Sequence, residues 1–161
     1  MIAENIKRVF IAKYNSVPLI VRSPGRINLI GEHTDYNEGY VLPAAINKAA
    51  YIAVSLRDDD EIQLTAHDLN ETFSINIKDL KPIDGINWPN YILGAAAQFK
   101  AKGKLIRGFN AILSSDIPIG AGLSSSAAVE CSVVFALDEL LQTGLEKIEM
   151  VKMAQKAEHE Y

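Results

Sequence analysis

PIGAGLSSSAAVECSVVFALDELL, residues 118–141, is the stretch of sequence that decides the fold. It opens with a glycine-rich turn and continues from Leu123 to Leu141 as a helix that is apolar almost all round. A helix with that pattern is expected at the centre of a domain, buried by its neighbours. A predicted strand at residues 108–115 precedes the turn. We therefore expect a strand, a glycine-rich loop and a buried helix in direct succession.

The elements on either side of this stretch indicate an α+β fold. Spacing of apolar residues, together with glycine and proline signals, predicts helices at residues 1–15, 88–102 and 145–161. Alternation and β-forming residues predict strands at residues 19–22, 49–56, 61–66 and 72–77. We expect the first strand to end at Ser23-Pro24-Gly25 and residues 58–60 to form a turn. Strands dominate the first half and strict β-α alternation is absent, which is typical of the α+β class.

Composition limits the classes of function. The 161 residues are 48% apolar and 22% charged, as expected for one soluble globular domain. A net charge of −4 argues against a nucleic-acid partner. The charged first residues are unlike a signal peptide, and no run of about 18 to 20 apolar residues predicts a membrane span. A single cysteine, Cys131, fits a reducing, cytoplasmic location, while the sequence gives no indication of the oligomeric state.

The glycine-rich turn has two interpretations on local grounds. Gly120 and Gly122 allow the backbone to approach a ligand closely, and the first turn of a helix offers unpaired amides to an anion. Equally, the pattern describes a tight turn whose serines cap the helix. The two common nucleotide-binding patterns are absent, since the turn contains no lysine and Ser125 occupies the third Rossmann glycine position.

A second polar cluster lies in residues 24–39, PGRINLIGEHTDYNEG. Its density of hydrogen-bonding side chains between glycines suits a polyol, because each sugar hydroxyl both donates and accepts. A solvated loop held by local contacts explains the same composition. Zinc binding by Glu32, His33 and Asp35 is a weaker alternative, because no second histidine lies at ligand spacing.

Both stretches resemble motifs of one family. PIGAGLSSSAA is similar to the phosphate-binding motif of the kinases of galactose, homoserine, mevalonate and phosphomevalonate, known as the GHMP kinases. GRINLIGEHTDY is similar to the galactokinase signature within that family. The resemblance implies an α+β fold, the GHMP kinase N-terminal domain, like the second domain of ribosomal protein S5. It also implies that residues 1–161 are an incomplete N-terminal domain, and that the protein transfers a phosphoryl group from ATP to the anomeric hydroxyl of galactose.

The resemblance also implies roles for individual residues. Arg26 would stabilise the transition state, and Ser126 and Glu158 would bind Mg²⁺. Trp88 would line the adenine pocket, although a core tryptophan is an equal alternative. The galactose contacts would be Glu32, His33, Thr34 and Asp35. The ATP contacts would be Gly120, Ala121, Gly122, Leu123, Ser124, Ser125 and Ser126.

The family's general base, an aspartate, has no counterpart in these residues. Asp116 and Asp138 lie outside the motif that carries it. We therefore expect little or no kinase activity from residues 1–161 alone. Two alternatives stay open for the longer protein, namely a kinase of N-acetylgalactosamine and a galactokinase-like sensor that binds sugar and ATP but signals through a partner protein.

Overall fold

A computed structural model describes residues 1–31, 37 and 39–161. Within these residues the strands form one sheet in the order β1-β2-β5-β3-β4. All neighbouring strands are antiparallel except β3 and β5, which are parallel. The elements along the chain are α1 (Ile2–Tyr14), β1 (Leu19–Ile30), β2 (Leu42–Leu56), β3 (Glu61–Ala66), β4 (Glu71–Asn76), the 3₁₀ turn η2 (Ile77–Asp79), α2 (Trp88–Ala101), β5 (Phe109–Ser115), α3 (Ser125–Leu141) and α4 (Lys147–Glu160). The predicted α+β class is confirmed.

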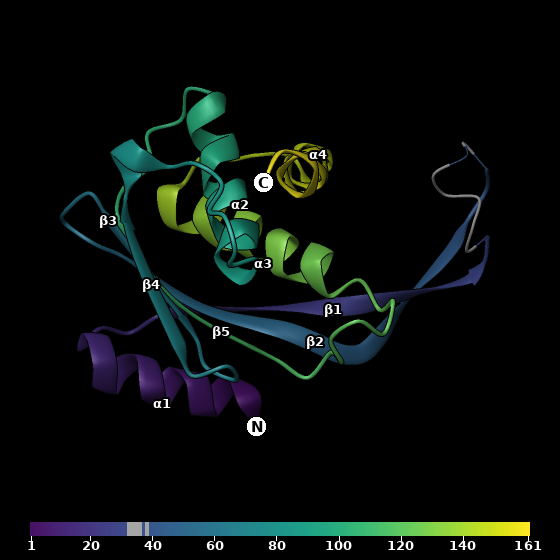
Figure 1. The fold of residues 1–161 in the computed structure, drawn as a ribbon, viewed down its shortest axis with the longest axis horizontal. Coiled ribbons are helices and arrows are strands. Elements are labelled where there is room, and N and C mark those ends of the chain that lie inside the picture. The colour runs from purple at the N-terminus through teal and green to yellow at the C-terminus, as the bar shows by residue number, and fades with distance from the viewer. Residues whose placement is uncertain (32–36, 38) are drawn as a thin grey trace.

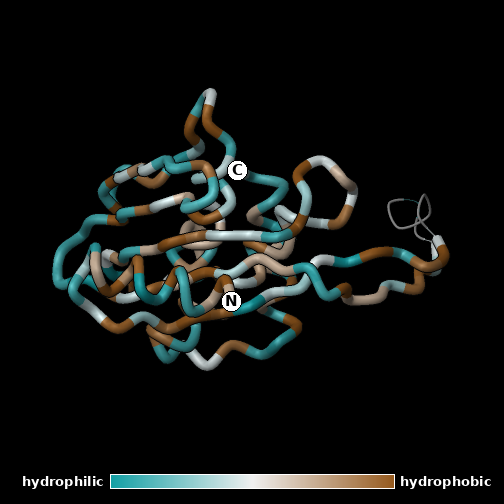
Figure 2. Tube along the Cα trace, turned by 90° about the horizontal axis from the view of Figure 1, so that it is seen from below, coloured by the Kyte–Doolittle hydropathy of each residue, from teal (hydrophilic) through white to brown (hydrophobic). Residues whose placement is uncertain are grey.

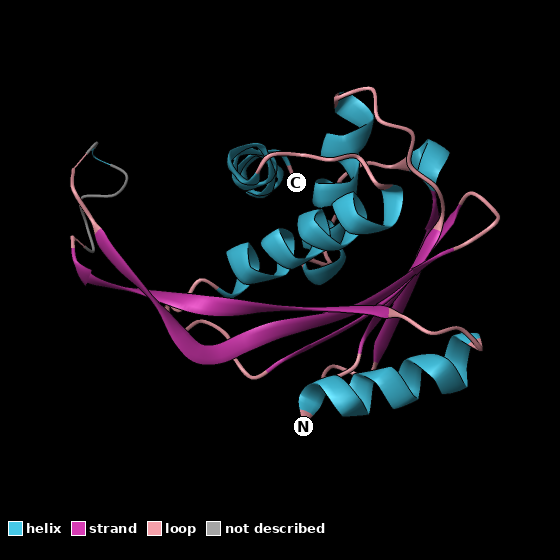
Figure 3. Ribbon diagram, turned by 180° about the vertical axis from the view of Figure 1, so that it is seen from behind, coloured by secondary structure: helices cyan, strands magenta, loops and turns pink. Residues whose placement is uncertain are grey.

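The helices cover the two faces of the sheet unequally. Helices α2, α3 and α4 lie on one face, and α1 lies on the other (Figures 1 and 3). The main core joins alternate residues of β2 to α2 and α3, whereas Ile6 and Phe10 of α1 pack with Ala53 and Ile112 on the opposite face. Because both faces are covered here, residues 49–56 of the inner strand β2 are an almost continuous apolar run and not an alternating one.

Strand β1 corrects the predicted end at Ser23-Pro24-Gly25. It continues through these residues to Ile30, paired with a β2 that begins at Leu42 instead of the predicted Ala49. Proline is tolerated because β1 is an edge strand, so Pro24 need not donate to a second neighbour. The register shifts between Pro24 and Arg26, which marks an irregularity of the bulge type. Arg26 therefore lies on a strand, and not in the loop that the sequence suggested.

The outer parts of β1 and β2 form an arm that projects beyond the helices (Figure 1). Its apolar residues Leu29, Ile30 and Leu42 are 61%, 68% and 52% exposed. Figure 2 shows hydrophobic stretches along this arm, away from the body of the domain. The predicted sugar-binding residues 32–35 lie outside the described residues.

Two helices begin later than the sequence indicates. Helix α3 begins at Ser125 and not Leu123, because Gly122 and Ser124 have φ angles of 68° and 57° that cannot continue into a right-handed helix. Helix α4 begins at Lys147 after Glu146, whose carboxylate forms a capping box with Glu149. The predicted position of α3 is confirmed, since it packs against β1, β2, α2 and α4.

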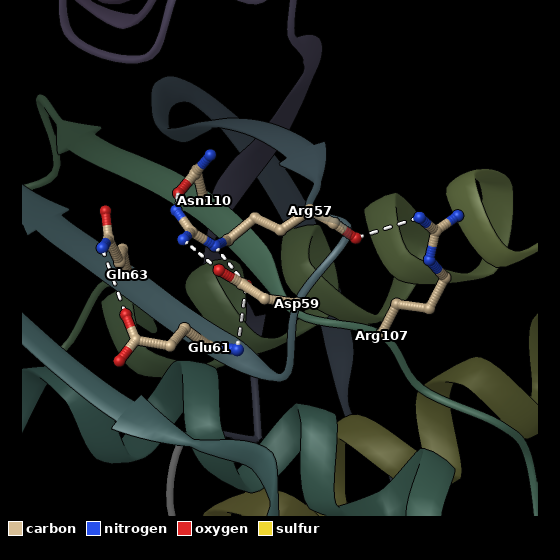
Figure 4. A network of polar contacts seen from close by, with 6 residues as sticks. All are labelled: Arg57, Asp59, Glu61, Gln63, Arg107 and Asn110. Atoms are coloured by element: carbon tan, nitrogen blue, oxygen red, sulfur yellow. Dashed lines mark hydrogen bonds and ion pairs between the residues drawn. The ribbon is translucent and has the colours of Figure 1, made fainter.

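A polar network joins the β2–β3 turn to the start of β5 (Figure 4). The guanidinium of Arg57 donates to both carboxylate oxygens of Asp59, at 2.7 and 2.5 Å, and to Asn110 at 2.9 Å. The amide of Glu61 also donates to Asp59, and these bonds, first of all that from Arg57, lower the Asp59 pKa to about 2. Arg107 donates to the carbonyl of Arg57 at 3.0 Å. The network fixes the turn against the strand that leads to the glycine-rich loop.

Candidate active site

The glycine-rich loop connects β5 to α3 and leaves the start of that helix open. Gly120 and Gly122 have φ angles of 72° and 68°, which favour glycine. Ser124 is the N-cap residue, and its side chain makes no capping hydrogen bond. The first amides of a helix have no partner within the helix, so this terminus can accept an anion. The alternative interpretation, in which the serine side chains cap the helix, does not hold for the side chain of Ser124.

The loop is fixed directly to strand β1. The amide of Arg26 donates to the carbonyl of Leu123 at 3.1 Å. Gly25, the preceding residue, is buried, and a Cβ atom there would lie 2.9 Å from the same carbonyl oxygen. This contact places the strand that carries Arg26 beside the loop and the first turn of α3. Only a glycine at position 25 permits so close an approach.

Replacing Gly25 by alanine is expected to displace the loop and weaken nucleotide binding. The added methyl group would meet the Leu123 carbonyl and the side chains of Ile46 and Ile117 at 2.9, 3.2 and 3.3 Å. The isoleucines can adjust, but the carbonyl belongs to the loop backbone. We expect a loss of about 1 to 3 kcal/mol in stability and a raised Kd for ATP, measured by calorimetric titration of the full-length protein.

The control for this substitution is Gly103→Ala. Gly103 lies at the end of α2 with a φ angle of 70°, and a methyl group added there would meet no atom within 4 Å. Gly103→Ala should lower stability without changing the affinity for ATP. Equal ATP affinities in the wild type and in Gly25→Ala would contradict the argument.

An apolar cavity of about 160 Å³ lies on one side of the first turn of α3. Trp88 and Tyr91 of α2, Leu69 and Val129 contribute much of its wall, and Ser125 and Ser126 line it too. The indole of Trp88 donates to Glu71 at 2.6 Å, which fixes the ring. Trp88 is therefore a cavity wall and not only a core residue. An apolar slot beside helix-terminal amides suits a flat ring attached to phosphates.

A second, more polar hollow of about 480 Å³ lies on the other side of the same turn. Arg26 and Ser124 line it from β1 and the loop, and Glu158 lines it from α4. Arg26 and Glu158 are both exposed to the solvent there. The structure thus brings together the predicted transition-state residue and one predicted metal ligand. Ser126, the other predicted ligand, lines the apolar cavity instead.

Glu130 is a residue of this hollow that the sequence analysis did not single out. It lies on α3, is 1% exposed, and its Oε1 atom has no hydrogen-bond partner. Burial, followed by a hydrogen bond to Glu158 and the charge of that residue, raises the pKa of Glu130 to about 9. A glutamate within the mostly apolar run 127–137 was the signal that could have identified it.

Glu130 and Glu158 also affect a tyrosine of α2. The pKa of Tyr91 is raised by burial and then by the charges of Glu158 and Glu130. Charges on α3 and α4 therefore act on a tyrosine of α2 that lines the apolar cavity. Among the described residues, no group of three or more His, Cys, Asp or Glu side chains is arranged to hold a metal ion. Glu158, which is exposed in the polar hollow, nevertheless offers a hard oxygen ligand of the kind that Mg²⁺ prefers.

Asp116 and Asp138, which come before the loop and near the end of α3, have structural contacts. Asp116 accepts from the amide of Ala49 at 2.7 Å and pairs with Lys48 at 3.4 Å, and the first of these contacts lowers its pKa the most. Asp138 accepts from Thr143 and from the amide of Leu145 in the turn between α3 and α4. Both carboxylates are occupied by contacts that shape the fold.

Comparison with known protein families agrees with this architecture. Residues 8–56 match the galactokinase galactose-binding signature, and residues 90–161 match the GHMP kinases N terminal domain. The chain belongs to the GHMP kinase family. No helix in the described part of the chain is long and apolar enough to cross a membrane.

Within this family the chain groups with the galactokinases. It is 42% identical over 142 residues to a galactokinase of Thermotoga petrophila, covering 88% of this chain and 39% of that protein. A galactokinase of Clostridium tetani is 39% identical, with coverage of 86% and 36%. The chain therefore spans about two fifths of the length of these relatives.

Solved structures of two GHMP kinases superpose on this chain. The structure of Lactococcus lactis galactokinase complexed with galactose superposes with a TM-score of 0.90 and 34% identity, covering 100% of this chain and 43% of that one. Methanococcus jannaschii mevalonate kinase superposes with a TM-score of 0.79 and 28% identity, covering 90% and 47%.

Proposed function

We propose that the full-length protein is a galactokinase, which transfers the γ-phosphoryl group of ATP to the anomeric hydroxyl of galactose. The observation that carries this proposal is the hydrogen bond between Arg26 and Leu123. It joins the strand within the galactose-binding signature to the loop at the open end of α3. A sugar bound by the signature and phosphates bound by the loop would meet beside Arg26. Residues 1–161 would form most of the N-terminal domain.

The nucleotide would occupy the apolar cavity and the loop. Its adenine ring fits the slot walled by Trp88 and Tyr91, and its phosphates fit the amides at the start of α3. Residues 120–126 would contact the phosphates next to the adenine slot. The family uses ATP, and ATP is the nucleotide that we assign here.

The acidic side of the turn suits Mg²⁺. Glu158 would hold the ion, which, when bound, neutralises negative charge on the phosphates. Ser126, the second predicted ligand, lines the other cavity, so the residues of the polar hollow support only the Glu158 half of that prediction. Glu32, His33, Thr34 and Asp35 would bind the hydroxyls of galactose. Arg26 would stabilise the charge that builds on the transferring phosphoryl group. The bond from galactose O1 to the γ-phosphorus forms as the bond to ADP breaks.

The proton of the attacking hydroxyl needs a base, and Asp116 and Asp138 are engaged in structural contacts. Residues 1–161 alone are therefore expected to turn over at least about 10²- to 10⁴-fold more slowly than the full-length protein. A coupled assay of ADP release measures both. Turnover by residues 1–161 near the full-length rate would contradict this assignment.

The same assay tests the substrate. The full-length protein should phosphorylate galactose in preference to N-acetylgalactosamine and glucose, and mass spectrometry should identify galactose 1-phosphate. A preference for N-acetylgalactosamine would make the protein a kinase of that sugar. Binding of galactose and ATP without any ADP release would instead favour a sensor.

A further inference from the structure

We propose that Glu71 is a positioning residue for the nucleotide base, because its carboxylate holds the ring of Trp88 in place at the wall of the apolar cavity. Glu71 is the first residue of β4, and it lies outside both sequence motifs and outside the lining of the cavity itself. The inference rests on the proposed function, since it concerns how the kinase orders its base slot before the nucleotide binds.

The contact between Glu71 and Trp88 fixes the edge of the indole ring. Trp88 is the first residue of α2, it is half-buried, and the segment that leads to it, residues 84–87, is exposed. Its indole N–H donates to Oε2 of Glu71 at 2.6 Å. The indole has only this one donor, and a charged acceptor makes a stronger hydrogen bond than a neutral one. The carboxylate therefore selects one orientation of the ring.

Glu71 is itself held in place by the turn that precedes it. This turn, residues 67–70, joins β3 to β4. Within it, one oxygen of the Asp68 carboxylate accepts from the hydroxyl of Ser114 at 2.8 Å, and the other accepts from the amide of Ser115 at 2.6 Å. Both oxygens thus attach the turn to the end of β5, so the backbone that carries Glu71 has a fixed place on the sheet.

The turn links two elements that line the same cavity. The end of β5 contributes Ser115 to the lining, α2 contributes Trp88, and the turn itself contributes Asp68 and Leu69. A line of hydrogen bonds runs from β5 through Asp68 to the turn, and from Glu71 to the indole. Because β5 leads directly into the glycine-rich loop, the ring is also placed relative to the amides that would hold the phosphates.

This contact should matter more for binding than for folding. Glu71 is exposed, and exposed polar contacts contribute little to stability. A flat base, in contrast, needs the ring of Trp88 in one orientation to stack on it. Ordering one loose side chain during binding lowers affinity by about 2- to 10-fold. A purely structural role for Glu71 predicts the reverse, a loss of stability without a loss of affinity.

The experiment measures nucleotide binding by calorimetric titration of the full-length protein with a non-hydrolysable ATP analogue and Mg²⁺. Glu71→Gln keeps an oxygen acceptor for the indole and should bind the analogue within about twofold of the wild type. Glu71→Leu removes the acceptor at similar size and should raise the Kd about 3- to 10-fold. Tripolyphosphate has no base, so its Kd should be the same in Glu71→Leu and the wild type.

The matched control is Glu61→Leu, at the other end of the same hairpin. Its carboxylate is exposed and accepts from Gln63 at 3.3 Å, and it does not line the cavity. This variant should bind the ATP analogue as the wild type does. Thermal melting should show Glu71→Leu to be folded, with a Tm close to that of Glu61→Leu.

A double-mutant cycle tests whether Glu71 acts through the indole N–H. Phenylalanine has no such donor, so adding Glu71→Leu to Trp88→Phe should cause no further loss of affinity for the analogue. Four results would each overturn the proposal: wild-type affinity in Glu71→Leu, an equal loss in Glu71→Gln, an equal loss for tripolyphosphate, or a further loss in the Trp88→Phe background.

The outcome is distinct from that of the proposed function. A wild type that does not phosphorylate galactose, but shows the expected pattern of affinities for the analogue, refutes galactokinase activity and supports the positioning role. An active galactokinase whose Glu71→Leu variant binds the analogue normally refutes the positioning role alone.

Discussion

Arg26→Ala in the full-length protein is expected to lower kcat for galactose phosphorylation about 10²- to 10³-fold, with a much smaller change in the KM for either substrate. Arg26 lines the polar hollow with Ser124 and Glu158, beside the open end of α3. Its charge would act mainly when negative charge moves onto the transferring phosphoryl group. Removing one such preorganised donor typically costs about 3 to 4 kcal/mol of transition-state stabilisation. Steady-state kinetics by coupled ADP release measures the effect.

The matched control for Arg26→Ala is Arg22→Ala on the same strand. Arg22 donates to the carbonyl of Asn47 at 2.9 Å and to the hydroxyl of Tyr51 at 3.3 Å, and it is not part of the hollow. Its removal deletes the same charge and should leave kcat within about twofold, since exposed contacts contribute little. A normal kcat in Arg26→Ala would sink the assigned role. If Arg26→Ala still produced the normal response in a protein partner, the alternative of a galactokinase-like sensor would be favoured.

Gly108→Ala is expected to produce the largest loss of stability, about 3 kcal/mol or more. Gly108 is buried where the start of β5 meets the β2–β3 turn, and its amide donates to the carbonyl of Asp59 at 3.1 Å. An added Cβ atom would lie 2.5 Å from the carbonyl oxygen and 2.9 Å from the amide nitrogen of Glu61, and closer still to the carbonyl of Asp59. These are backbone atoms within the network of Figure 4, so no side-chain rotation relieves the overlap.

Thermal unfolding followed by circular dichroism measures this loss, which should lower Tm by roughly 6 to 12 °C for a domain of this size. Gly85→Ala is the control, because Gly85 has a φ angle of 79° and open space where a methyl group would be added. It should lose only about 1 to 2 kcal/mol, from left-handed backbone strain alone. Equal losses in the two variants would show that the predicted overlap at Gly108 is relieved in solution.

Local sequence patterns were sufficient for most elements of the fold. Strand β3 has the predicted bounds, and α1, α2 and β5 agree with the prediction to within one or two residues. Their signals are local: apolar spacing, alternation, and proline or glycine at the ends. The glycine-rich loop and the buried helix α3 also occur in the predicted order. The sequence motif in that loop indicated the family without the tertiary structure.

The length of β1 was not accessible to the same reasoning. Ser23-Pro24-Gly25 has the composition of a strand end, and it becomes a strand only because β1 lies at the edge and β2 continues beside it. Pairing between residues far apart in sequence is a tertiary property. For the same reason Arg26 was expected in a loop, although its backbone amide in fact fixes the glycine-rich loop.

By itself, the sequence determined the class of fold, the family and the identities of the groups at the open end of α3, because backbone conformation and hydrogen-bonding chemistry are local properties of residues. Only the tertiary structure decided which of those groups share a hollow. It placed Arg26 with Glu158, put Ser126 with Trp88 in the cavity on the other side of the helix, and buried Glu130 at the wall of the polar hollow. The physical reason is that burial and the proximity of charges depend on how α2, α3 and α4 pack, and no local pattern contains that packing.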